Sequence, residues 1–144
     1  MAFLSIMLVC NIILNSMPEI AEFDAEAGPF LRISNPICSG DDKEALLDVD
    51  LVVLRPFNAS NGAIAVWKID HHGVVECVVK KNPCDWNQPG SPSPPCPWQP
   101  NDFVIVSTAC FTNFPSGNYE SSITGTLHGA PLFEKPINCS FNNP

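Results

Sequence analysis

Seven cysteines constrain the fold of this 144-residue chain more than any other feature. Cys10 lies in an apolar N-terminal run, and the six that follow are Cys38, Cys77, Cys84, Cys96, Cys110 and Cys139. An even number of cysteines in a short exported chain is typical of a disulfide framework. Their spacing lacks the close cysteine pairs of zinc sites. We therefore expect three disulfides, an oxidising compartment and no metal.

The N-terminal segment resembles a secretory leader. Residues 3–14 form an apolar run that is too short to span a bilayer but fits the hydrophobic part of a signal peptide. No Lys or Arg precedes the run. Cleavage near residues 15–16 and near residues 25–27 both stay open, and a buried N-terminal strand or helix is the alternative. We expect a leader over 1–27 and one domain over 28–144.

Two glycosylation sequons fit an exported chain. They begin at Asn58 and Asn138, and such Asn-x-Ser tripeptides mark surface sites in secreted proteins. Cys139 stands in the middle of the second sequon, whereas Asn58 lies beside an Asn-Gly turn signal. Asn58 is therefore the predicted glycan acceptor.

Strand periodicity follows the leader. In residues 46–54, Leu47, Val49 and Leu51 alternate with polar residues, which is typical of a half-buried strand. Residues 119–128 alternate in the same way along their whole length. Further strands are predicted at 30–33, 63–69, 74–79, 103–108 and 132–141. Six or seven short strands separated by turns predict an all-β, antiparallel β-sandwich.

Residues 83–100, the Pro-rich loop, contain seven prolines together with Trp86 and Trp98. This proline density excludes a regular strand or helix. One interpretation is a flexible linker between domains. Cys84 and Cys96 lie near both ends of the segment, so we favour a pinned, rigid loop that carries the two tryptophans.

The chain offers little catalytic chemistry. Its formal net charge is −8, and its seven basic residues are scattered, which excludes a nucleic-acid partner and disfavours purely electrostatic membrane binding. Asp70, His71 and His72 share a turn and are interpreted as solvated polar residues, because a zinc site needs more converging ligands. No common enzyme motif is present. We therefore expect neither an enzyme nor a cofactor.

The strands supply apolar side chains for the interior of the sandwich. If the sheets spread apart, that interior becomes a pocket for lipids or other hydrophobic ligands. Otherwise the same residues form an ordinary core, and the pattern alone does not separate the two. The candidate lining residues are Val52, Leu54, Ile64, Val66, Val75, Val79, Val104, Val106, Ile123 and Leu127.

The order of these features resembles the ML (lipid-recognition) domain family, and within it the ganglioside-activator proteins. The similarity covers about residues 38–141, and the stretch between Cys38 and Cys77 is shorter than in the family by about one hairpin. The residues that carry the resemblance are Cys38, the strand Val49-Asp50-Leu51-Val52, the close pair Cys77 and Cys84, Cys96-Pro97-Trp98, the strand start Ser116-Gly117-Asn118-Tyr119, and Cys139.

The resemblance implies an immunoglobulin-like sandwich around a lipid cavity. It also implies the disulfides Cys38–Cys139, Cys77–Cys84 and Cys96–Cys110. The resemblance further implies that Trp86 and Trp98 lie in exposed loops that touch a membrane. Trp side chains are well suited to the membrane–water interface. The expected function is a secreted or lysosomal, non-catalytic carrier or activator for a glycolipid or sterol, with transient membrane contact and a partner hydrolase.

A second hypothesis involves no lipid ligand. A secreted β-sandwich with a filled core could act as an adhesion, inhibitory or effector protein. It would then bind its partner through the Pro-rich loop and the two tryptophans.

Overall fold

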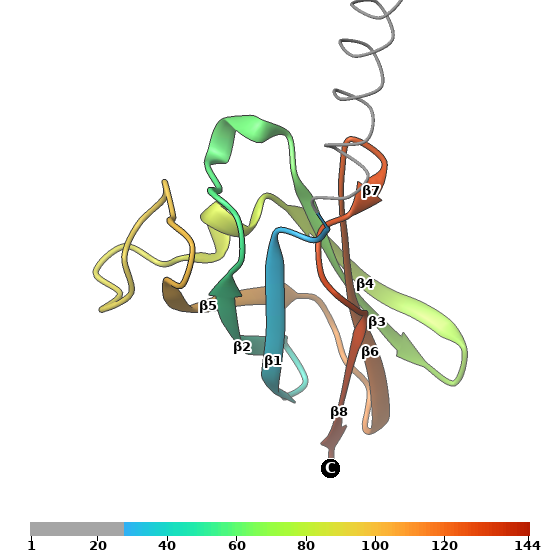
Figure 1. Ribbon diagram of the computed structural model, residues 1–144. Helices are drawn as coiled ribbons and strands as arrows, with labels where there is room; N and C mark the ends of the chain where they lie inside the picture. The colour runs from blue at the N-terminus through green and yellow to red at the C-terminus, as the bar shows by residue number, and fades with distance from the viewer. Residues whose placement is uncertain (1–27) are drawn as a thin grey trace, which may run out of the picture.

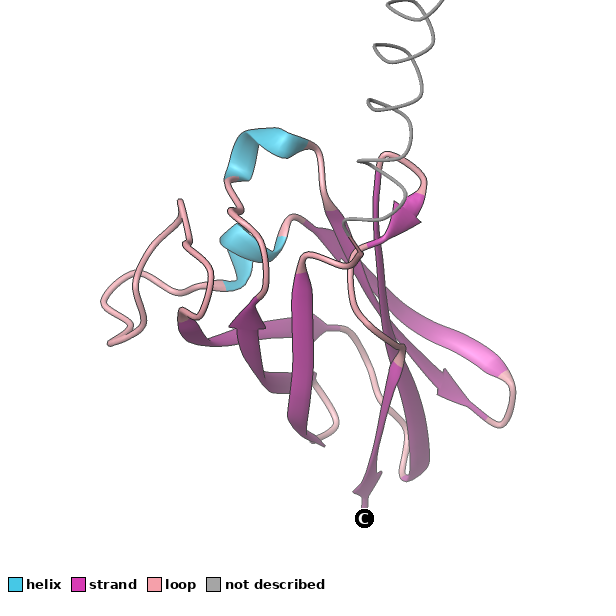
Figure 2. Cartoon of the chain, viewed as in Figure 1, coloured by secondary structure: helices cyan, strands magenta, loops and turns pink. Residues whose placement is uncertain are grey.

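The computed structural model describes residues 28–144, which form two antiparallel sheets (Figures 1 and 2). The first sheet has the order β1-β2-β5, and the second has the order β4-β3-β6 with β7 and β8 both paired to β6. The predicted leader over 1–27, with Cys10, lies outside the described residues. The strands are β1 (Leu31–Gly40), β2 (Glu44–Val53), β3 (Ile64–His71), β4 (Val74–Lys81), β5 (Phe103–Phe111), β6 (Gly117–Leu127), β7 (Ala130–Pro131) and β8 (Ile137–Asn143).

The predicted all-β, antiparallel sandwich is confirmed. Two short 3-10 turns, η1 (Ala59–Asn61) and η2 (Pro83–Trp86), interrupt the strands. Within residues 28–144, no helix is long and apolar enough to cross a bilayer.

Strand periodicity explains which face of each long strand is buried. In β2, Leu47, Val49 and Leu51 are buried, as the alternation of that segment predicts. In β6, Tyr119 and Ile123 point inward in the same phase. These side chains from the two sheets belong to one buried hydrophobic cluster.

The first strand is longer than its sequence indicates. A strand is predicted only around residues 30–33, but β1 continues to Gly40 through an irregular register between Ser34 and Ile37. Asn35 there has a φ of 48°, a left-handed conformation that Asn tolerates better than most residues. Pro36 cannot donate to a ladder, and it is accommodated because β1 is an edge strand.

The disulfides differ in part from the implied pairing. Cys38 is joined to Cys139, as the resemblance implies, but the other two bridges are Cys77–Cys110 and Cys84–Cys96. The implied Cys77–Cys84 bridge is wrong because β4 stays extended from Cys77 to Lys81. Four extended residues span about 13 Å, which is well beyond the Cα separation of about 6 Å that a disulfide allows. Cys110 therefore pairs with Cys77, and the implied Cys96–Cys110 bridge is wrong as well.

Two of the disulfides start from the two ends of one row of residues that crosses the second sheet. Cys77, Ile69, Ser121 and Cys139 are successive cross-strand partners through β4, β3, β6 and β8. Each end of this row crosses to the first sheet, through Cys110 of β5 at one end and Cys38 of β1 at the other. The two disulfides therefore tie the sheets together along both sides of the sandwich, which we call the β1–β8 side and the β4–β5 side.

Aromatic rings fill the interior between the sheets. Trp67 is fully buried in the middle of β3, and at one end Tyr119 stacks on Phe141 with ring centroids 5.1 Å apart. The phenol of Tyr119 donates a hydrogen bond of 2.6 Å to the Pro115 carbonyl. Burial, and secondarily the nearby Glu76 carboxylate, raise the pKa of this phenol.

Candidate functional site: a hollow at one end of the sandwich

The ten candidate lining residues are divided between the interior and the outer faces. Buried positions are held by Val79, Val104, Val106, Ile123 and Leu127. Val52, Leu54 and Val66 are half-buried, and Ile64 and Val75 are exposed at 47% and 48% of their surface. In β3, the residues that point inward are Ala65, Trp67 and Ile69. The phase expected for β3 is therefore wrong by one residue, which exchanges the two faces of a strand.

A small apolar hollow opens where β1 begins and β6 ends. Its volume is about 220 Å³, and its walls are mostly apolar. Leu127 is the one lining residue that the sequence also proposes for a cavity, since the others lie in turns and at the start of the described chain. The lining residues are Gly28, Phe30, Arg55, Leu127, His128 and Ala130.

Phe30 is held at the hollow by Arg55. The Arg55 guanidinium lies over the Phe30 ring, 4.0 Å from its centroid, and donates a hydrogen bond of 3.1 Å to the Gly28 carbonyl. A cation over an aromatic face at this distance is attractive. These contacts place an aromatic side chain between the hollow and the core.

Aromatic rings continue from the hollow into the core. Phe30 meets Phe57 edge-on, with centroids 6.2 Å apart, and Phe57 stacks on Trp98 at 5.6 Å. Phe57 and Trp98 also exchange backbone hydrogen bonds of 3.0 Å and 2.7 Å. A ligand group that entered the hollow would therefore meet aromatic rings, in contact with one another, before it met the sheets.

The interior contains buried polar atoms without a hydrogen-bond partner among the described residues. They include the indole N–H of Trp67 and the hydroxyl of Thr108. Leaving a buried donor or acceptor unpaired costs roughly 1–3 kcal/mol. The interior thus offers a hydrogen bond to a polar group that reaches it.

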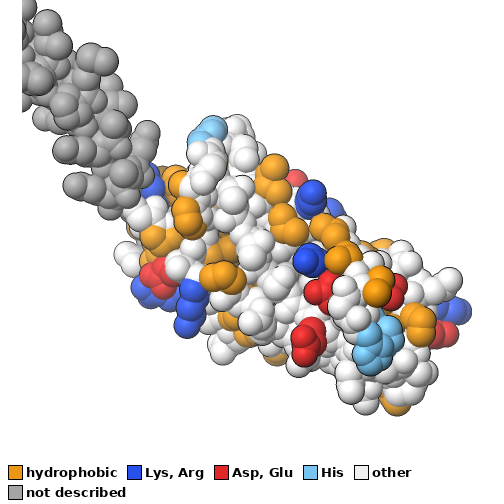
Figure 3. Space-filling view, turned by 90° about the vertical axis from the view of Figure 1, so that its right-hand side faces the viewer, with side chains coloured by type: hydrophobic (Ala, Val, Ile, Leu, Met, Phe, Trp, Pro, Cys, Tyr) orange, Lys and Arg blue, Asp and Glu red, His pale blue; other side chains and the backbone are white. Residues whose placement is uncertain are grey.

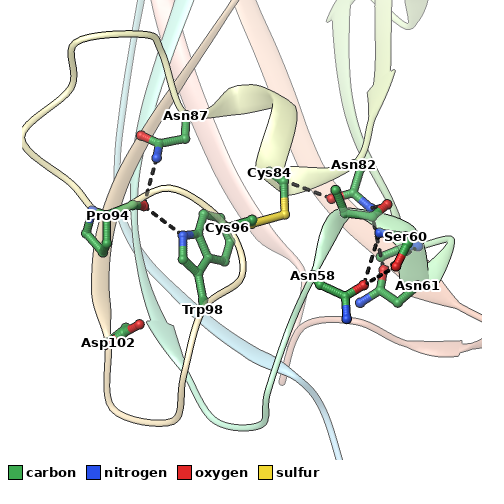
Figure 4. Close-up of a disulfide and its surroundings, with 12 residues drawn as sticks. Asn58, Ser60, Asn61, Asn82, Cys84, Asn87, Pro94, Cys96, Trp98 and Asp102 are labelled. Atoms are coloured by element: carbon green, nitrogen blue, oxygen red, sulfur yellow. Dashed lines mark hydrogen bonds between the residues drawn. A yellow bond between two sulfur atoms is a disulfide. The ribbon is translucent and has the colours of Figure 1, made fainter.

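Trp86 and Trp98 do not form an exposed membrane-contact loop. Their exposed fractions are 1% and 0%, so that prediction is wrong. The Trp98 indole donates a hydrogen bond of 2.8 Å to the Pro94 carbonyl, which also accepts one of 2.9 Å from the Asn87 amide (Figure 4). The Cys84–Cys96 bridge closes the same loop. Both rings therefore anchor the Pro-rich loop to the core.

The Pro-rich loop covers the free edge of β5. The Ile105 amide donates a hydrogen bond of 2.9 Å to the Ser93 hydroxyl, and the Ser107 carbonyl accepts one of 3.3 Å from the Gln88 side chain. An uncovered edge strand is a template for unwanted pairing. The loop is thus a structural cover on the β4–β5 side.

Asn58 occupies an exposed turn at the same end of the sandwich as the hollow. Its side-chain oxygen accepts hydrogen bonds of 3.0 Å and 2.7 Å from the Ser60 amide and hydroxyl. Figure 4 shows the Asn58 amide nitrogen pointing away from Ser60. Its glycosylation stays a prediction.

Two larger hollows lie on outer faces. One of about 360 Å³ on the second sheet is polar and includes Asp70, Glu120 and Ser140, and one of about 530 Å³ on the first sheet includes Ile37, Asp48 and Asp50. In residues 28–144 no three His, Cys, Asp or Glu side chains are grouped as metal ligands. Neither resolved carboxylate pKa shift belongs to the apolar hollow: backbone N–H donors lower the pKa of Asp41, which lines a smaller hollow of about 170 Å³, and the Arg32 hydrogen bond lowers that of Glu134.

Comparison with solved structures identifies the fold. A Niemann-Pick type C2 protein from the Japanese carpenter ant superposes with a TM-score of 0.52 and 9% sequence identity, covering 81% of this chain and 95% of that one. Beta-glucosidase 3B from Thermotoga neapolitana and a beta-glucosidase from Kluyveromyces marxianus give TM-scores of 0.41 and 0.40 at 11% identity. They are covered over 15% of their length, against 76% and 77% of this chain.

By sequence, no protein-family model and no curated protein matches this chain. At 9% identity, the similarity to the ant protein concerns the fold alone. The chain has the fold of the ML domain, an immunoglobulin-like β-sandwich.

Proposed function

We propose that this protein is a non-catalytic, secreted or lysosomal lipid-binding protein that holds the apolar part of a glycolipid or sterol at the hollow beside Phe30. The observation that carries the proposal is the apolar hollow at the end of an ML-type sandwich. The ring contacts from Phe30 to Trp98 support it, because they connect the hollow to the interior. A role as an activator that presents the lipid to a partner hydrolase stays a prediction.

The size of the hollow determines how a lipid fits. Its volume of about 220 Å³ is below the roughly 300–1,000 Å³ typical of small-molecule pockets. A complete lipid therefore fits only if Phe30 leaves its contact with Arg55. The proposal thus includes a movement of the Phe30 ring away from the hollow.

The second hypothesis expects a filled core, which is observed, and partner binding through the Pro-rich loop, for which the tryptophans offer no exposed surface. Trp86 and Trp98 are buried, and the loop contacts the edge of β5. We therefore do not assign the loop a partner.

A rim substitution tests the proposed site. Ala130 is exposed and lines the hollow, so A130W should fill it without disturbing the core. Asn113 is an exposed residue in the loop before β6, at the opposite end of that strand, and N113W is the matched control. Uptake of a fluorescent sterol and a fluorescent glycolipid by the purified secreted protein, with mass spectrometry of extracted lipid, gives the readout.

We expect the wild type and N113W to take up one of the two lipids and A130W to lose most of that uptake. Thermal unfolding should show that A130W remains folded. Equal uptake by A130W and N113W would mean that the lipid does not bind at this hollow. Absence of both extracted lipid and uptake in the wild type would refute lipid binding.

A further inference from the structure

The outer face of the β3–β4 hairpin combines exposed aliphatic side chains with lysines. Ile64 and Val78 are exposed at 47% and 42%, and Lys68 and Lys80 are exposed between them. Val66 is the cross-strand partner of Lys80, and Lys68 is the partner of Val78. Because partners share a face, each of these two cross-strand pairs places an apolar side chain beside a cationic one. We call Ile64, Val66, Lys68, Val78 and Lys80 the hairpin face.

The lysines of this face stand out in an acidic chain. The formal net charge is −8 with seven basic residues, and three of the seven, Lys68, Lys80 and Lys81, lie on this one hairpin. In the described part of the chain, none of the three makes an ion pair. Figure 3, which faces this side of the molecule, shows basic side chains among hydrophobic ones, with acidic side chains beside some of them.

Charge is separated along the second sheet. The row that contains Val66 and Lys80 lies four residues along β3 from the row that contains Asp70 and Glu120. Four residues of strand span about 13 Å, which exceeds the screening length of about 8 Å at physiological ionic strength. Lys68, however, lies two residues from Asp70 along β3, about 7 Å away and within that length, so the Asp70 carboxylate offsets part of its attraction for an anionic surface. Lys80, with Lys81 next to it in the chain, keeps its attraction and marks the cationic end of the sheet.

The cationic end is also the end that carries the hollow. Ile64 is paired with Thr126, and the next residue of β6, Leu127, lines the hollow. An anionic surface that attracted the lysines would therefore lie close to the opening. Apolar side chains on the same face suit a surface that is anionic outside and hydrocarbon within.

We propose that the hairpin face docks the protein on an anionic lipid bilayer, with the hollow held beside the membrane. The proposal rests on the lipid-binding function and names the surface through which lipid is reached. It replaces the buried Trp86 and Trp98 as the membrane contact.

Vesicle binding with charge-matched variants tests the docking. K68E/K80E reverses two charges on the face. K43E/K135E changes the net charge equally at two exposed lysines elsewhere, in the β1–β2 turn and before β8. Flotation would compare vesicles of phosphatidylcholine with vesicles that contain 30% phosphatidylserine.

Each lysine near an anionic membrane contributes roughly 1 kcal/mol, or about fivefold in affinity. We therefore expect the wild type and K43E/K135E to bind phosphatidylserine vesicles, with binding that weakens at high salt, and K68E/K80E to bind at least about 25-fold more weakly. Equal losses in both variants would reduce the effect to net charge and overturn the proposal. So would equal binding of the wild type to neutral vesicles, or no vesicle binding at all. Self-association without vesicles that K68E/K80E abolishes would assign the face to a second copy instead.

Supplying the lipid from two different sources distinguishes docking on a membrane from binding of the lipid. Lipid supplied from cyclodextrin needs no membrane contact, so K68E/K80E should load from it as well as the wild type does, yet load slowly from phosphatidylserine vesicles. A wild type that docks on vesicles but loads from neither source would refute the proposed function while the docking stands. A wild type that loads equally well from both sources, with K68E/K80E unchanged in both, would overturn the docking.

Discussion

The two sides of the sandwich are closed by different means. On the β1–β8 side, the Phe30 and Leu31 amides both donate to the Leu132 carbonyl at 3.1 Å, and the Glu134 amide donates to Leu31. On the β4–β5 side, the edge of β5 depends on side chains of the Pro-rich loop, such as Ser93. Backbone hydrogen bonds, as on the β1–β8 side, can persist when a side chain is substituted. Side-chain hydrogen bonds, as at the edge of β5, are lost when the side chain that makes them is replaced. Each side also carries one disulfide between the sheets.

The largest expected effect on folding stability comes from the disulfides that join the sheets on the two sides. On the chain-entropy model, the Cys38–Cys139 bridge, with a separation of 101 residues, contributes about 4.7 kcal/mol, and Cys77–Cys110, with 33, contributes about 3.7 kcal/mol. C38A/C139A should therefore lower the free energy of unfolding more than C77A/C110A. Urea denaturation without reductant measures both. The Cys84–Cys96 bridge, with 12 residues, is the control at about 2.8 kcal/mol, and a larger loss in C84A/C96A would reject this ranking.

Trp98 tests the loop that covers the β4–β5 side. Because its ring is fully buried and stacked on Phe57, W98A should cost about 3–5 kcal/mol of folding stability. W98F keeps a ring in place but loses the hydrogen bond to Pro94, at about 1 kcal/mol. Chemical denaturation gives both values. Unchanged stability of W98A, with weaker vesicle binding, would restore Trp98 as a membrane contact.

A smaller effect is expected at the edge of β5. S93A removes the acceptor of the Ile105 amide, so that amide should exchange its hydrogen faster and stability should fall by about 1 kcal/mol. S91A is the matched control, because the Ser91 hydroxyl accepts only from the Ser93 amide within the loop. If Ile105 exchange is the same in both variants, the loop does not protect the strand.

The smallest effect belongs to the β1–β8 side and depends on pH. The Arg32 guanidinium hydrogen-bonds Glu134 at 3.0 Å, and this bond, followed by its charge, lowers the pKa of the Glu134 carboxyl. A lowered pKa in the folded state stabilises the fold above the ordinary Glu value of about 4.3, and that stabilisation is lost as the pH falls through the lowered value. R32Q should therefore melt slightly below the wild type at pH 7, and the two melting curves should converge at pH 3. A gap that is unchanged at pH 3 would exclude the ion pair as its cause.

The strands were predictable where only one face is apolar. In β2 and β6 the alternation gives the buried face directly, as Leu47 and Ile123 illustrate. In β3, apolar residues such as Val66 and Trp67 occupy both faces, so periodicity does not select the inner one. The extension of β1 past Pro36 also escaped prediction, because an edge strand tolerates a proline that a central strand would not.

The candidate site was predictable in chemistry but not in position. Apolar lining was expected, yet Phe30, Arg55 and Ala130 lie at the ends of strands and in turns, where no local pattern marks them. The burial of Trp86 and Trp98 follows from contacts with distant residues such as Phe57. The pairing of Cys77 with Cys110 depends on how two sheets face each other, which a linear spacing of cysteines does not encode.

The Cys38–Cys139 bridge has a mechanical consequence. It joins the first strand of the described domain to its last, so a force applied at residues 28 and 144 passes through the two sulfur atoms. The segment between the two cysteines, which are 101 positions apart in the sequence, then bears no tension, and only the short stretches outside the bridge can lengthen, at about 3.3–3.6 Å per residue. When the oxidised protein is pulled by these ends, it should lengthen only slightly while the sandwich stays folded. Reduction of the bridge should allow the chain to extend to its full contour length.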